Sequence, residues 1–208
     1  MMAGVKQFNQ EEVLDKAMEV FWQKGYEGTS IQDLTKATGL GRGSLYGAFG
    51  DKEQLFITVL DRYGDKFQAQ IVEQLNNPNP YQAIEGMFEV MIERMSNPNY
   101  PRGCLNTNTS VSFGGKSEMI ERKIAERLGG LESSIYLVLR KAQAEEKLSS
   151  EKDIRALARF LVGVSQGMAV LNKTFADPSV IRDVAKVALS FWEPIEKYKT
   201  NREAKPQP

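Results

Sequence analysis

The sequence predicts an all-α fold, with a three-helix N-terminal domain followed by a larger C-terminal helical domain. Three observations lead to this prediction. Apolar residues recur at helical spacing over most of the 208 residues. A short segment that ends at Gly39 is joined by a tight glycine turn to a second short segment. Stretches rich in Pro, Gly and Asn separate the longer helical segments.

Composition excludes several classes of functional site. The chain has one Cys and no His, so it cannot form a Ser-His or Cys-His catalytic pair, a His-based metal site or an intramolecular disulfide. We therefore predict no catalytic residues, no metal site and no cofactor. The 27 basic and 27 acidic residues give a net charge of zero, so binding to nucleic acid would have to depend on a local patch.

Neither a membrane-spanning segment nor a signal peptide is evident. The chain has no run of about 18 apolar residues, and its first residues lack the apolar core of a signal peptide. We therefore expect a cytoplasmic protein that makes no membrane contact. The polar segment 199–208 is expected to be a disordered tail.

The first helix is predicted from about residue 9 to residue 24. Val13, Ala17 and Phe21 recur there at helical spacing, and Gly25 is expected to end the helix. Phe21, Trp22 and Tyr26 are interpreted as core residues, since aromatic side chains are more often buried than functional.

The segment Ser30–Lys52 carries the pattern of a helix-turn-helix. Ser30 is a suitable N-cap, and Asp33 three residues later completes a sequence close to a capping box. Gly39 can take the left-handed conformation that stops a helix. A second helix is then expected up to Phe49, with Leu45, Ala48 and Phe49 facing inward. Two helices at such a turn are built to place the second helix in a major groove.

The outward side chains of this segment suit a DNA backbone. No acidic residue lies between Thr35 and Gly50, whereas cationic residues lie within that stretch and just after it. The predicted phosphate contacts are Thr29, Tyr46 and Lys52, with Lys36 on the same surface. Arg42 and Ser44 are predicted to reach base edges, Arg42 most plausibly guanine, and Gly43 to allow a close approach of the helix.

Residues 13–56 resemble the DNA-binding domain of TetR-type bacterial transcriptional regulators. The resemblance rests on the order and spacing of residues that include Ala17, Phe21, Lys24-Gly25-Tyr26, Thr29-Ser30-Ile31, Leu34, Ala37, Gly39-Leu40, Gly43-Ser44-Leu45-Tyr46, Phe49 and Lys52-Glu53. It implies sequence-specific binding to a double-stranded operator. One departure is Gly47-Ala48, where the family usually has a larger residue after the recognition-helix tyrosine.

A long helix is predicted from Asp51 to about Leu75, and the segment 76–80 breaks it sharply. Its first turns complete the N-terminal core, and its remainder enters the rest of the chain. The predicted organisation is therefore a helix-turn-helix domain over residues 1–56, a helical ligand-binding and dimerisation domain over 57–198, and the tail.

The middle of the chain is predicted to bind a small, largely apolar effector. Helices are expected over residues 81–95, 104–113 and 117–147, with Met and aromatic residues concentrated on the first of them. A plain hydrophobic core is the alternative interpretation of these residues. The predicted pocket residues are Met87, Phe88, Met91, Cys104, Phe113, Ile135 and Met168.

The last two helices, about 151–175 and 178–197, are apolar over more than one face, so they need partners on several sides. The TetR resemblance implies that they pair with their symmetry mates in a homodimer. Two recognition helices that meet two half-sites also require a dimer. The alternative is that these helices only complete the monomer core.

Cys104 follows Pro-Arg-Gly at the expected start of a helix. A helix N-terminus and the neighbouring Arg102 both favour the thiolate, which makes Cys104 a candidate redox or electrophile sensor. The alternative is a buried structural cysteine.

Together these patterns indicate a homodimeric DNA-binding regulator, a repressor released from its operator by a small apolar or electrophilic effector. One rival is an all-helical enzyme with Cys104 as nucleophile, which lacks an evident general base. Another is a helical interaction module without DNA binding. The sequence leaves open the operator, the regulated genes, the effector, repression as opposed to activation, and the role of Cys104.

Overall fold

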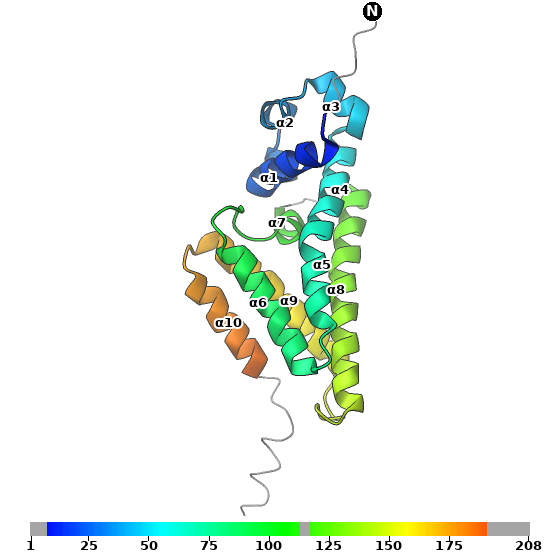
Figure 1. The fold of residues 1–208 in the computed structure, drawn as a ribbon, viewed down its shortest axis with the longest axis vertical. Coiled ribbons are helices and arrows are strands. Elements are labelled where there is room, and N and C mark those ends of the chain that lie inside the picture. Colours follow the sequence, from blue (N-terminus) through cyan, green and yellow to red (C-terminus); the bar gives the residue numbers. More distant parts are fainter. Residues whose placement is uncertain (1–7, 113–116, 191–208) are drawn as a thin grey trace, which may run out of the picture. The chain divides into compact units, whose positions relative to one another are not determined.

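The computed structural model describes residues 8–112 and 117–190, and all regular structure in these ranges is helical (Figure 1). The predicted all-α fold is therefore confirmed. The structure divides into two compact units. One lies within residues 1–66 and 105–124, and the other within residues 67–104 and 125–208.

The first unit begins with α1 (Gln10–Gly28), whose N-terminus is capped by Asn9. The Asn9 side chain accepts the backbone N–H of Glu11 at 3.0 Å, which satisfies a donor that the helix leaves unpaired. Gly25 interrupts α1 with a φ of +73°, a conformation that favours glycine. The predicted helix end at Gly25 is therefore a break within the helix, and a last turn follows it.

Aromatic residues form the core of the first unit around α1, α2 (Ile31–Thr38), α3 (Arg42–Phe49) and α4 (Lys52–Tyr63). The ring centroids of Phe21 and Phe56 lie 4.7 Å apart, and those of Trp22 and Tyr63 lie 5.0 Å apart in an edge-on arrangement. The predicted core role of Phe21 and Trp22 is confirmed, since both are buried.

The helix α7 (Leu105–Ser112) belongs to the first unit, although it follows α6 (Pro80–Ser96) in the sequence. Its buried polar residues include Asn108, whose side-chain amide donates to the carbonyl of Trp22 in α1 at 3.5 Å. The structural units thus interleave along the chain, in contrast to the linear division into 1–56 and 57–198, which stays a prediction.

The predicted long helix over 51–75 is present as a continuous run. It comprises α4, a π-helical segment over Gly64–Gln68, and α5 (Ala69–Leu75). Asp51 caps the run by accepting the N–H of Gln54 at 2.9 Å. The boundary between the two units falls within the π-helical segment, a kind of insertion that is often found where a helix has a functional role.

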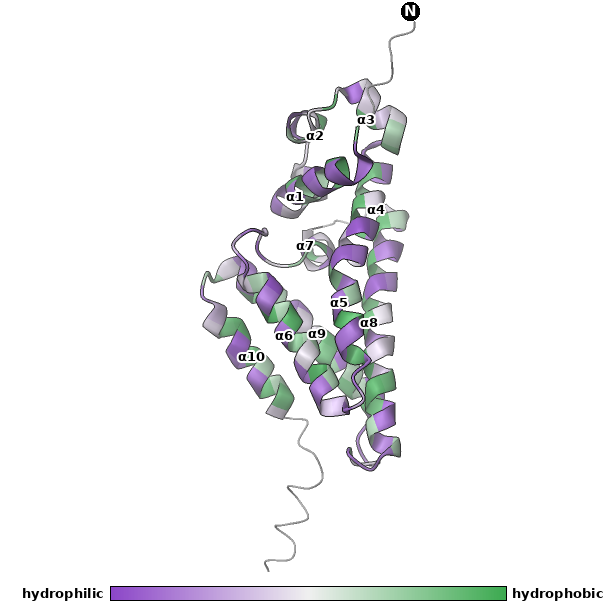
Figure 2. Cartoon of the chain, viewed as in Figure 1, coloured by the Kyte–Doolittle hydropathy of each residue, from purple (hydrophilic) through white to green (hydrophobic). Residues whose placement is uncertain are grey.

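The second unit contains α5, α6 (Pro80–Ser96), most of α8 (Glu118–Ala144), α9 (Ile154–Thr174) and α10 (Pro178–Ser190). Asn79 and Asp153 cap α6 and α9 with their side chains. Hydrophilic and hydrophobic residues alternate along α6 and α10, as expected of helices with one buried face (Figure 2). Residues 191–197 of the predicted last helix and the predicted tail lie outside the described residues.

The helix α9 leaves much of its apolar surface uncovered within the chain. By length and composition it could cross a membrane, although such a match also fits a helix of a soluble protein. Exposed apolar side chains on or next to α9 and α10 are Phe160, Val170, Phe175 and Val187. Each of these side chains would gain from burial against another surface.

Candidate nucleic-acid interface

The helix-turn-helix forms as its local sequence predicts. The Ser30 hydroxyl accepts the N–H of Asp33 at 3.1 Å, and the Asp33 carboxylate accepts the N–H of Ser30 at 2.9 Å, which completes a capping box. Gly39 has a φ of +72°, and its N–H donates to the carbonyl of Thr35 at 3.0 Å. The turn between α2 and α3 is therefore fixed by local hydrogen bonds.

The Asp33 carboxylate also pairs with Lys24 of α1 at 2.5 Å. The hydrogen bond from Lys24 is the largest cause that lowers the pKa of this carboxyl well below its usual range, and hydrogen bonds from Ser30 add to it. The positive charge of Lys24 thus offsets the negative charge of Asp33 in the first turn of α2.

The helix α3 is anchored by one buried residue, and its outer face is open to solvent. Leu45 is fully buried, whereas Arg42, Gly43, Ser44 and Gly47 are exposed. The prediction that Ala48 faces inward is wrong, because Ala48 is exposed in the chain. The outer surface of α3 consequently carries one cation among small residues.

The two glycines of this face are not required by packing within the chain. A Cβ atom added at Gly43 or Gly47 would meet nothing within 4 Å, and neither residue has a positive φ. Because glycine is unfavourable inside a helix, a close approach of the helix backbone to another molecule is one physical reason for Gly43, where that approach is predicted.

Two predicted DNA contacts are aromatic–cation neighbours. The Arg42 guanidinium carbon lies 5.4 Å from the centroid of the Tyr46 ring, one helical turn further along α3. The Lys52 ammonium, in the first turn of α4, lies 4.5 Å from the centroid of the Tyr26 ring in α1. Burial lowers the pKa of Lys52, and burial together with nearby acidic groups raises the pKa of Tyr26. Sequence reasoning assigned Tyr26 to the core alone and missed this contact.

The remaining predicted contacts differ in accessibility. Lys36 is exposed in the last turn of α2. Thr29 is only 1% exposed, and its hydroxyl donates to the carbonyl of Gly25 at 2.6 Å. The structure thus gives Thr29 a capping role between α1 and α2, and its contact with phosphate stays a prediction.

The predicted pocket residues come together as a packed core in the second unit. Met87, Phe88, Met91, Ile135 and Met168 are buried in one apolar cluster, and the half-buried Cys104 packs against it. Phe113 lies outside the described residues. No described cavity is lined by these buried residues, so the effector pocket at this cluster stays a prediction.

A buried amide that the sequence did not reveal fixes the loop before Cys104. The Oδ1 of Asn172 accepts the N–H of Gly103 at 2.8 Å, and its Nδ2 donates to the carbonyl of Met95 at 3.0 Å. The sequence did contain one signal of this contact, an Asn within the apolar pattern of α9. A buried polar side chain is normally hydrogen-bonded, so Asn172 could have been predicted to have buried partners.

Comparison with known families gives two matches that together cover most of the chain. Residues 13–59 match the model described as bacterial regulatory proteins of the tetR family. Residues 80–188 match a tetracyclin repressor-like C-terminal domain.

Curated relatives and solved structures agree with these matches. The HTH-type transcriptional repressor ComR of Escherichia coli (strain K12) is 32% identical over 194 residues, which cover 92% of each chain. The uncharacterized HTH-type transcriptional regulator YezE of Bacillus subtilis (strain 168) is 32% identical over 194 residues, 92% of this chain and 100% of YezE. A cysteine mutant of the TetR family transcriptional regulator CifR, solved with 26-bp operator DNA, is 28% identical with a TM-score of 0.84 and covers 90% of this chain and 98% of its own.

Proposed function

The chain belongs to the TetR family of bacterial regulatory proteins, and from this premise we propose that it is a cytoplasmic repressor that a small molecule releases from its operator. It acts as a homodimer and is not an enzyme. The observation that carries the proposal is the outer face of α3, where Arg42 stands among small exposed residues close in sequence to Lys52.

The side chains of this face divide into readers and phosphate contacts. Arg42 and Ser44 extend from the exposed start of α3 and are assigned to base edges, Arg42 to the O6 and N7 of guanine. Tyr46 and Lys52 are assigned to phosphates, together with Lys36. CifR, a relative of the same fold, has been solved on operator DNA, which supports the assignment of this surface to a duplex.

The dimer is assigned to α9 and α10. The exposed apolar residues Phe160, Val170 and Val187 lie on these helices and supply the surface that a second copy would cover. A dimer with two copies of α3 matches two half-sites about one helical turn apart, or a multiple of that distance.

Release by an effector requires that the small molecule bind one conformation of the dimer more tightly than the other. The apolar cluster around Met87, Phe88 and Met168, with Cys104 against it, is the proposed effector region in the second unit. An electrophile that modifies Cys104 is a covalent version of the same proposal.

Binding of the purified protein to the DNA upstream of its own coding sequence tests the function. Mobility shifts at two salt concentrations should show tight, salt-sensitive binding, because each phosphate contact releases counterions. Arg42→Ala should lose the preference over unrelated DNA, whereas Lys16→Ala, a cation on α1 paired with Glu12, should retain it. If Arg42→Ala and the wild type preferred this DNA over unrelated DNA equally, the assignment of Arg42 to base edges would be refuted.

A further inference from the structure

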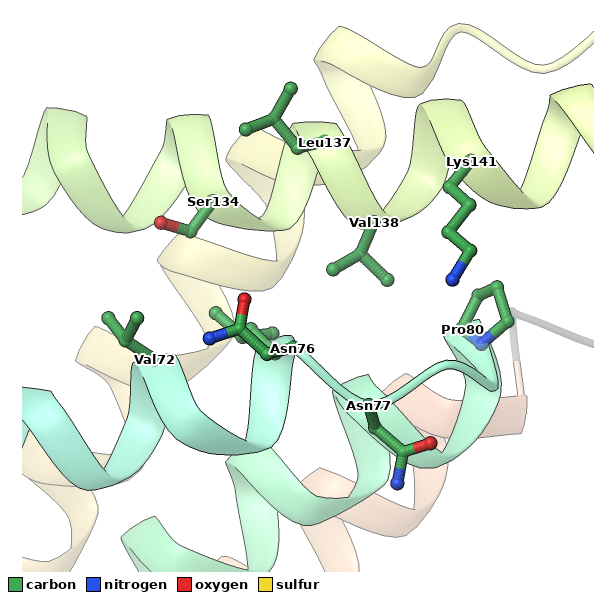
Figure 3. Close-up of a pocket in the computed structure, with 9 residues that line it drawn as sticks. Val72, Asn76, Asn77, Pro80, Ser134, Leu137, Val138 and Lys141 are labelled. Atoms are coloured by element: carbon green, nitrogen blue, oxygen red, sulfur yellow. The ribbon is translucent and has the colours of Figure 1, made fainter.

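A groove in the second unit lies between the end of α5, the turn that leads to α6, and α8 (Figure 3). Its volume is about 260 Å³, and of the predicted effector-pocket residues that the structure describes, none lines it. We propose that this groove binds a small monocarboxylate with an apolar body. The proposal does not rest on DNA binding.

The apolar part of the groove has a buried floor and an exposed rim. Leu75 and Val138 are buried beneath it, while Val72 and Leu137 at its edges are 45% and 53% exposed. Branched apolar side chains at this exposure leave favourable burial unrealised. Because Val72 and Leu137 lie on α5 and α8, the dimer proposed through α9 and α10 does not account for them.

The side chain of Lys141 places a positive charge at one end of the groove. Figure 3 shows Lys141 extending from α8 towards Pro80, and its ammonium donates to the carbonyl of Pro78 at 3.1 Å. An ammonium has three donors, so further donors remain for a ligand. The Glu145 carboxylate lies 3.9 Å from the Lys141 ammonium and 2.8 Å from the Lys147 ammonium. Its ion pair with Lys141 is therefore the weaker of the two.

Amide and hydroxyl groups complete the polar side. The Oδ1 of Asn77 accepts the N–H of Asn79 at 2.9 Å, and in Figure 3 the Asn77 amide points away from α8, so Asn76 is the asparagine that can serve a ligand. The Asn76 side chain points from the end of α5 towards α8 in Figure 3. Ser134 donates its hydroxyl to the carbonyl of Gly130 at 3.0 Å, so its oxygen can accept a further bond.

These groups select the charge of the ligand. Among the described residues that line the groove none is acidic, and Lys141 is the cationic one. A carboxylate can therefore pair with Lys141 and accept from an asparagine amide, whereas a cationic ligand would be repelled. A volume just below the usual range of about 300–1,000 Å³ for ligand pockets limits the ligand to a small molecule.

The test uses 2-naphthoate as the probe and the full-length protein without DNA, so its result is independent of the proposed regulatory function. Calorimetric titration should show binding of 2-naphthoate. The neutral 2-naphthamide, which has nearly the same shape, should bind about tenfold more weakly because the charged hydrogen bond is lost. Methyl NMR signals of Val72 and Leu137 should shift on addition of 2-naphthoate.

Matched variants separate this site from general charge attraction. Lys141→Gln should weaken the binding of 2-naphthoate by about tenfold and leave the affinity for 2-naphthamide unchanged. Arg140→Gln removes an exposed cation from the adjacent position of α8, outside the groove, and should have no effect. Leu137→Asn, at an exposed position, should weaken both probes.

Three results would overturn the proposal. They are equal affinity for 2-naphthoate and 2-naphthamide, equal loss in Lys141→Gln and Arg140→Gln, and absence of any shift at Val72 and Leu137 at saturating or millimolar probe. Circular dichroism spectra identical to wild type are required of each variant, and the conservative Lys141→Arg should retain binding.

Discussion

The ammonium nitrogen of Lys52 lies 4.5 Å from the centroid of the Tyr26 ring, so a predicted phosphate contact at the start of α4 is held by an aromatic residue of α1. The Tyr26 ring also packs against Phe56, with centroids 5.0 Å apart. A ring at this distance restricts the lysine and compensates for part of its lost hydration. Tyr26 is thus placed to position the cation as well as to pack.

Replacement of Tyr26 should therefore change DNA binding through Lys52. Tyr26→Leu removes the ring face and should weaken operator binding about threefold to tenfold, whereas Tyr26→Phe retains the face and should bind nearly as wild type. Fluorescence anisotropy over a series of salt concentrations provides the measurement. Lys52→Gln should reduce the salt slope by about 1, and Tyr26→Leu should add little loss in that background. Additive losses would contradict the role of Tyr26 as a positioning residue.

The two glycines of α3 give a second, paired prediction. Gly43→Ala and Gly47→Ala should each raise the free energy of unfolding by up to about 1 kcal/mol, because a methyl group meets open space at both positions. Gly43→Ala should nevertheless weaken operator binding, since the helix is proposed to approach the DNA backbone there, whereas Gly47→Ala should not. Denaturant titration and anisotropy measure the two effects. A stabilised Gly43→Ala that binds as wild type would rule out the close approach at Gly43.

The turn and caps of the helix-turn-helix were predictable because they are encoded locally. Ser30, Asp33 and Gly39 meet their hydrogen-bond partners within a few residues, so the sequence specifies the geometry directly. The long helix that follows was equally clear from its apolar spacing, although the π-helical segment within it was not.

Several features that the sequence did not reveal depend on contacts between residues far apart in the chain. The bond from Asn108 to Trp22 joins α7 to α1 across 86 positions, and no local pattern indicates it. Tyr26 and Lys52 are likewise brought together by the packing of the first unit. Ala48 was expected inward from the helical period alone, but its neighbours in the fold leave it exposed.

The ion pair between Arg62 and Asp15 predicts how acid weakens the first unit. Arg62 donates from Nε and from a terminal nitrogen to the two Asp15 oxygens at 3.1 and 3.2 Å, which joins α4 to α1. Burial alone would raise the pKa of Asp15, but the hydrogen bonds and charges of Arg62 and Lys66 lower it below 3.8. A carboxyl whose folded pKa is depressed stabilises the fold above its unfolded pKa and loses that contribution as pH falls through the folded value.

Arg62→Gln should therefore lower the free energy of unfolding by about 1 kcal/mol at pH 7. The difference from wild type should shrink as the pH falls below about 4, where Asp15 becomes protonated in the unfolded chain and then in the folded chain. Urea titrations at several pH values measure it. Lys16→Gln, which removes an exposed pair with Glu12, should change the stability little at any pH. A difference that stays constant down to pH 2 would show that the pair is not its source.

Asn172 should be important for the stability of the second unit. Asn172→Leu keeps the size of the side chain but leaves the N–H of Gly103 and the carbonyl of Met95 without their partner, and it should cost about 2–3 kcal/mol. Thr174→Val, near the end of the same helix and exposed, is the control and should cost little. Denaturation at equal protein concentration compares them, since the proposed dimer would contribute to the apparent stability. A loss in Asn172→Leu no greater than in the control would mean that water replaces the amide.

Selection of binding sites from a pool of random duplexes tests the central claim most directly. Wild-type protein should enrich a palindromic sequence whose half-sites lie about one helical turn apart, or a multiple of it, with a conserved guanine in each half. The same selection with Arg42→Ala should keep the spacing and lose the preference for that guanine. Absence of any enriched sequence, or an identical sequence from Arg42→Ala, would contradict the account of α3 as the element that reads DNA.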